Sequence, residues 1–75
     1  MKADLGLINR ALAKTTGANV HDVRVLGAYY RNACEIAMAA VRTWPAAKRA
    51  ARLREIDEYA RVLEHFATTG QFPRK

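Results

Sequence analysis

The stretch RTWPAAK, residues 42–48, decides the fold of this chain. Proline has no backbone N–H and fits a helix only in its first turn, so a helix arriving from the N-terminal side must end here. Thr43 is a residue type that can cap the next helix, with Pro45 in its first turn. Because the corner is short, the helices on its two sides are expected to form an antiparallel hairpin.

Apolar and small residues recur at spacings of three and four on both sides of the corner, which is the pattern of an amphipathic helix. Before the corner these residues are Val23, Leu26, Tyr30, Ala33, Ala37, Ala40 and Trp44. After it they are Leu53, Ile56, Ala60, Leu63 and Ala67, flanked by Tyr59 and Phe66. The spacing therefore predicts long helices over residues 20–42 and 46–68.

Residue types that start and stop helices mark the ends of this pair. Asn19, with Asp22 three residues later, predicts the start of the first long helix. Gly70 predicts the end of the second, and Phe72 is placed to fold back on its last turn. Gly27 interrupts the first long helix, and the sequence leaves open whether that helix bends or breaks there.

A shorter helix is expected over residues 4–15. Asp4 is a candidate N-cap, and Gly17 suits a left-handed position after the helix end. Leu5, Ile8 and Leu12 form one apolar stripe. No segment alternates with the period of a strand, so the chain is expected to be all-α, with residues 1–75 as one small domain and 70–75 as a short tail.

Two expectations about burial follow from this arrangement. Between the long helices we expect a core containing Tyr30, Trp44, Leu53, Ile56 and Leu63. The helix at 20–42 is also apolar away from that core, at Val25, Tyr29, Ile36 and Met38. A helix apolar over most of its circumference is buried on more than one side, so we expect a homodimer.

The composition favours an anionic partner. Thirteen Lys and Arg residues against seven Asp and Glu give a net charge of +6. Such a balance suits DNA, an acidic protein surface or anionic lipid. No run of about 18 apolar residues exists, so no membrane-spanning segment is expected. The helix at 46–68 carries four acids on its polar face and needs its aromatic residues for the core, so no association with a membrane surface is expected either. The single cysteine, Cys34, and the lack of a secretory signal pattern favour a cytoplasmic protein.

The sequence gives no sign of catalysis. Cys34 falls near the apolar side of its helix, where a small core residue is the simpler interpretation. His65 has Arg61 and Thr69 as its neighbours four residues away, which is not a metal-binding pair. The sequence contains no phosphate-binding loop, CxxC pair or nucleophile elbow. We therefore expect that the chain is not an enzyme and that it binds no metal, cofactor or small-molecule substrate.

The segment LAKTTGANVHDVRVL, residues 12–26, carries one recognisable pattern. Its apolar, small and turn positions are Leu12, Ala13, Gly17, Val23 and Leu26. In this spacing the segment resembles the helix-turn-helix of bacterial and phage repressors. The resemblance implies that the second helix of the motif lies in the major groove, with Asn19, His21 and Arg24 facing the bases.

A basic cluster, Lys48, Arg49 and Arg52, opens the helix at 46–68. Cations at a helix N-terminus oppose the helix dipole, so an anion such as a DNA phosphate would compensate them. These observations together favour a small DNA-binding regulator. That function requires Asn19, His21 and Arg24 to be exposed on a protruding helix, in line with the basic cluster.

The alternative is a protein–protein interaction module, such as a phage- or plasmid-type accessory inhibitor that docks a helical face on a host protein. It predicts an exposed apolar patch around Tyr29, Ile36 or Phe72.

Overall fold

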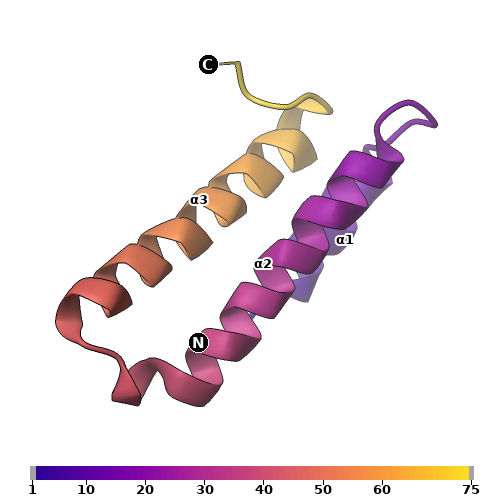
Figure 1. The fold of residues 1–75 in the computed structure, drawn as a ribbon. Coiled ribbons are helices and arrows are strands. Elements are labelled where there is room, and N and C mark those ends of the chain that lie inside the picture. The colour runs from indigo at the N-terminus through magenta and orange to yellow at the C-terminus, as the bar shows by residue number, and fades with distance from the viewer. Residues whose placement is uncertain (1, 75) are drawn as a thin grey trace.

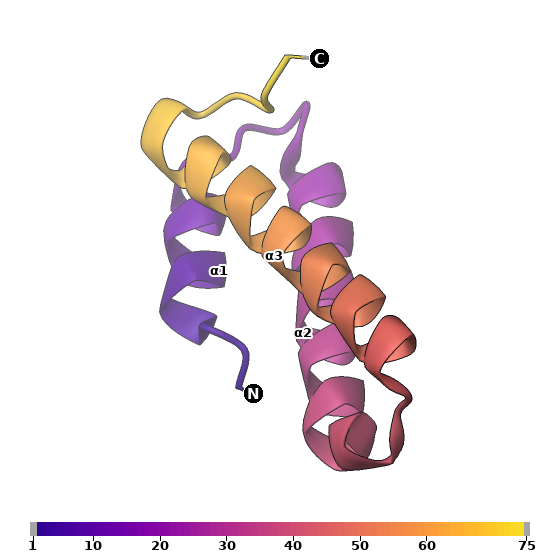
Figure 2. The same ribbon diagram turned by 90° about the vertical axis from the view of Figure 1, so that its left-hand side faces the viewer.

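The computed structural model describes residues 2–74, which form three α-helices and no strand. They are α1 (Leu5–Ala13), α2 (Val20–Ala40) and α3 (Ala46–Thr69), with a 3-10 turn, η1 (Val41–Thr43), after α2. The all-α prediction is confirmed, and the helix bounds lie within two residues of those expected from the sequence. Figure 1 shows α2 and α3 as an antiparallel hairpin, and Figure 2 shows α3 lying across both α1 and α2.

The corner forms where Pro45 requires it, but its capping differs from the expectation. Trp44 is extended, with φ −82° and ψ 139°, as the residue before a proline prefers. Pro45 itself is the N-cap of α3, and its carbonyl accepts from the Arg49 N–H at 2.9 Å. The expected cap by Thr43 is wrong, because its hydroxyl instead donates to the Ala40 carbonyl at 2.7 Å. That bond closes η1 rather than opening α3.

The loop between α1 and α2 also differs from the expected caps. Asp4 does cap α1, accepting from the Leu7 N–H at 3.0 Å. Asn19 precedes α2, but its side chain accepts from the Thr16 N–H at 2.7 Å and closes the loop instead. The left-handed position predicted for Gly17 is wrong, because among residues 2–74 only Gly70 has a positive φ, at 75°. Here α1 ends at Ala13, and Lys14 keeps a right-handed conformation.

Gly27 neither bends nor breaks α2, which runs without interruption from Val20 to Ala40. Gly27 is buried where α1 crosses α2. A Cβ atom added there would lie 3.2 Å from the Ile8 Cγ2 atom, closer than side chains normally approach. The absence of a side chain at Gly27 therefore lets the Ile8 side chain pack directly on the α2 backbone.

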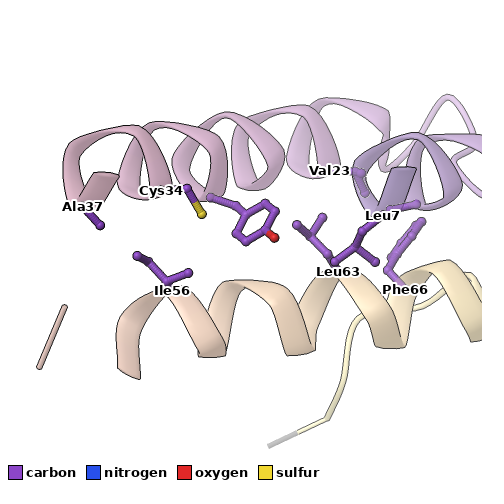
Figure 3. Packing of buried hydrophobic residues seen from close by; sticks show 9 residues of the cluster. Leu7, Val23, Cys34, Ala37, Ile56, Leu63 and Phe66 are labelled. Carbon is purple, nitrogen blue, oxygen red and sulfur yellow. The ribbon is translucent and has the colours of Figure 1, made fainter. Parts of the chain in front are cut away.

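The core lies where α3 meets the other two helices (Figure 3). Its buried apolar side chains are Leu7, Ala11, Val23, Tyr30, Cys34, Ala37, Ile56, Leu63 and Phe66. Burial of Tyr30, Ile56 and Leu63 was predicted correctly. Leu53 and Trp44, also expected in the core, are only partly buried and pack against its edge.

Two further differences concern the ends of the core. On α1 the core face is Leu7 and Ala11, while Leu5 of the expected stripe is 51% exposed. On α3 Phe66, expected at the flank, is fully buried. The predicted fold-back of Phe72 is confirmed, because its ring lies 4.9 Å from that of Phe66, centroid to centroid. Gly70 ends α3 in the left-handed conformation that this fold-back needs.

Candidate interaction surfaces

The residues carrying the helix-turn-helix resemblance occupy the loop between α1 and α2 and the helix ends beside it. Val23 is buried, Leu12 and Leu26 are partly buried, and Ala13 and Gly17 are exposed. The helix that would enter the major groove is the whole of α2, 21 residues long, which continues into the hairpin.

The structure places the six candidate DNA-binding residues in two groups. His21 and Arg24 are exposed in the first turns of α2, while Asn19 is half-buried with its amide turned toward Thr16. Lys48, Arg49 and Arg52 are all exposed at the start of α3.

These two groups are not brought together. Since α2 and α3 are antiparallel, their starts lie at opposite ends of the hairpin (Figure 1). Arg24 is separated from the end of α2 by about 24 Å of helix, at about 1.5 Å per residue. The groups also lie on different sides of α2, because Arg24 lines a groove toward α1 and Arg52 lines a groove toward α3.

Two cations of the basic cluster have partners within the chain. The Lys48 Nζ atom lies 5.6 Å from the centre of the Trp44 ring, a cation–π contact. Arg52 lies 3.8 Å from a Glu55 carboxylate oxygen. Arg49 takes part in none of the salt bridges found within residues 2–74. Part of the unfavourable charge at the start of α3 is therefore compensated without a phosphate.

One groove lies between α2 and α3, and we call it the aromatic groove. Its volume is about 180 Å³. The lining residues are Tyr29, Asn32, Ala33, Ile36, Trp44, Arg52, Glu55, Ile56 and Tyr59. Its charged lining side chains are Arg52 and Glu55, which lie 3.8 Å apart, and the Lys48 ammonium lies over the Trp44 ring at one end.

The two tyrosines of the aromatic groove belong to different helices. The rings of Tyr29 and Tyr59 lie 6.4 Å apart, centroid to centroid, at an angle of 31°. The Tyr59 hydroxyl donates to Glu55 at 3.2 Å. Burial raises the pKa of Tyr59, and the bond to the Glu55 carboxylate raises it further, so the phenol stays protonated as a donor. The groove thus has one fixed aromatic wall.

The outer edge of the aromatic groove is apolar and open. Tyr29 is 58% exposed and Ile36 is 49% exposed, and both lie on α2. This is the apolar patch predicted for a protein-docking module. It arises because α1 and α3 cover only part of the over-wide apolar surface of α2.

A second groove lies between α1 and α2, and we call it the basic groove. Its volume is about 560 Å³. The lining residues are Leu5, Ile8, Asn9, Leu12, Arg24, Gly27, Ala28, Arg31, Asn32 and Glu35. A smaller hollow continues it past Leu5 to Lys2, Ala3 and Met38. The apolar stripe of Leu5, Ile8 and Leu12 therefore lines this groove, and Ile8 and Leu12 also pack against the core.

Cys34 is buried, and that burial raises the pKa of its thiol, so it remains protonated in the core. Within residues 2–74 no three His, Cys, Asp or Glu side chains are grouped to hold a metal ion. No helix in the same range has the length and apolar character needed to cross a membrane.

Comparison of the chain with protein-family models, with curated proteins and with solved structures gave no match.

Proposed function

We propose that this chain is a protein–protein interaction module that acts by binding and not by catalysis. The observation that carries the proposal is the exposure of Tyr29 and Ile36 beside Tyr59 on the aromatic groove. Exposed aromatic and aliphatic side chains gathered on one face are typical of protein interfaces. The predicted cytoplasmic location suits such a module, whose lone cysteine needs no oxidising compartment.

The occupant of the aromatic groove, in this proposal, is a second copy of the chain. Two copies that each carry a net charge of +6 repel one another wherever cations face cations. The aromatic groove lowers that cost, because its lining is mostly apolar and its Arg52 faces Glu55. A small domain also gains much from added apolar burial, because its own core is limited. Pairing about a two-fold axis would place the same residues on both sides.

Sedimentation equilibrium is expected to give about twice the chain mass of 8.4 kDa at micromolar concentration. Replacing Ile36 by glutamate is expected to weaken dimerisation about ten-fold or more, because a carboxylate would be buried in an apolar interface.

The matched control is Met38→Glu, which changes a side chain 55% exposed on the same helix but outside the aromatic groove. It should leave dimerisation unchanged. A wild-type monomer at hundreds of micromolar, or equal weakening by both variants, would refute self-association through this groove.

DNA binding stays a second candidate, favoured by the exposure of His21 and Arg24 at the start of α2. If DNA is a ligand, affinity for a mixed-sequence duplex should fall steeply as salt rises, because bound phosphates release counterions. Replacing Arg49 and Arg52 together should lower the salt slope by up to about 2, whereas Arg24→Ala should relax sequence preference. Absence of binding by the folded protein at tens of micromolar and physiological salt would remove this candidate.

A further inference from the structure

We propose that the basic groove binds an acidic amphipathic helix supplied by a different protein. The groove lies between α1 and α2 and shares Asn32 of α2 with the lining of the aromatic groove. The inference rests on the proposed protein-binding function but not on self-association.

The shape of the basic groove suits a helix. Its α1 side presents Leu5, Ile8 and Leu12, and Leu5 alone is 51% exposed. Its α2 side presents the small exposed side chain of Ala28, while Gly27 is buried beneath Ile8 at the floor. Leucines on one wall facing a small residue on the other leave room for the apolar side chains of an incoming helix.

The length of the groove matches a short helix. Its lining on α2 extends from Arg24 to Glu35, or about 16 Å at about 1.5 Å per residue. Three turns of a helix span the same distance, at about 5.4 Å per turn. Such a helix would place apolar residues at positions i, i+3, i+4 and i+7 along the groove.

The charges at the groove edges select an acidic partner. Arg24 and Arg31 lie on α2 and Lys2 lies where the groove continues, against the single carboxylate of Glu35. Within residues 2–74 Arg24 forms no salt bridge. Arg31 pairs with Glu35 at 3.2 Å, but both side chains are more than half exposed, so the pair is readily exchanged for another.

The same charges disfavour the other occupants. Arg10 is exposed on α1 and Lys14 directly follows that helix, so inserting α1 of a second copy would bring cations against Arg24 and Arg31. DNA would meet the arginines but would leave Leu5 and Leu12 uncovered by apolar groups. An amphipathic helix with leucines on one face and glutamates beside them satisfies both the apolar floor and the cationic edge.

The test uses three synthetic peptides of equal length and fluorescence anisotropy on the full chain. The first is an amphipathic helix with leucine at i, i+3, i+4 and i+7 and glutamate on its flanks. The second has the same composition in scrambled order, and the third has lysine in place of glutamate. The first peptide should bind, and the other two should bind at least about ten-fold more weakly.

Protein variants then locate the site. Arg24→Glu and Leu5→Glu should each lower the affinity for the acidic peptide about ten-fold, while Arg24→Glu should raise the affinity for the lysine peptide. The matched control is Arg54→Glu, a charge reversal at an exposed α3 position that lines neither groove. It should leave binding unchanged, and circular dichroism should be the same for every variant.

Two results would overturn the assignment. One is equal affinity for the acidic and lysine peptides, and the other is weakening by Arg54→Glu as large as that by Arg24→Glu. Self-association is tested separately, by Ile36→Glu with Met38→Glu as its control. If the acidic peptide does not bind the basic groove but the dimer forms, the proposed function is retained and only this inference is refuted.

Discussion

Replacing Leu63 by alanine is expected to lower the free energy of unfolding by about 2–5 kcal/mol. Leu63 is completely buried on α3, the helix that covers both of the others. Truncation removes favourable apolar burial and leaves a cavity that the crossing helices cannot close without moving together. Domains of this size have a small margin of stability, so a large fraction of the variant should be unfolded at 37 °C. Urea titration followed by circular dichroism measures the change.

The control for this prediction is Leu5→Ala, the same chemical change at a leucine that is 51% exposed. It should cost well under half as much, because little apolar area is lost from the folded state. Equal destabilisation by the two variants would mean that the faces of α1 and α3 have been assigned wrongly.

Replacing Gly27 by leucine is expected to destabilise the chain by about 3 kcal/mol, the upper range for overpacking. The sign of this change in the free energy of unfolding is informative. At an open helix position the same substitution would stabilise the protein by about 1 kcal/mol, because leucine has a higher helix propensity than glycine. At Gly27 even a Cβ atom would lie 3.2 Å from the Ile8 Cγ2 atom, so a leucine there must displace the Ile8 side chain from its packing on α2. Hydrogen exchange should then show loss of protection in residues 5–13.

The neighbouring substitution Ala28→Leu serves as the control, because Ala28 is exposed and lines the groove instead of the contact. It should change stability by less than about 0.5 kcal/mol. If Gly27→Leu were neutral or stabilising, α1 and α2 would not be in the close contact described.

The hairpin was predictable because its signals are local. Pro45 prevents a continuous helix, and the spacing of Ile56 and Leu63 marks the buried face of α3 without knowledge of its neighbours. The face of α1 was not predictable in the same way. Which of its two adjacent apolar stripes enters the core depends on the angle at which α1 crosses α2, and Gly27 sets that contact from fourteen or more residues away.

The caps failed for a related reason. Thr43 and Asn19 are residue types that favour N-caps, and each lies just before a helix. Each side chain instead hydrogen-bonds a backbone group in the turn that precedes the helix. Short polar side chains form such local bonds as readily as caps. Sequence pattern does not distinguish the two outcomes.

The exposed apolar edge of the aromatic groove was predicted from the sequence, whereas the basic groove was not. Exposure of Tyr29 and Ile36 follows from an apolar surface on α2 wider than two helices can cover. The basic groove was not predicted, because the spacing of Leu5, Ile8 and Leu12 indicates an apolar stripe but not which part of that stripe faces outward. In the structure the stripe lies opposite Ala28 on α2.

Isotope-filtered NOE spectroscopy on a mixture of labelled and unlabelled chains tests the self-association claim most directly. If two copies meet at the aromatic groove, the Ile36 methyl groups of one chain should show contacts to tyrosine ring protons of the other. The Met38 methyl group, outside that groove, should show none. Contacts between chains at Met38 but not at Ile36, or no contacts between chains at all at millimolar concentration, would contradict the proposed role of this surface.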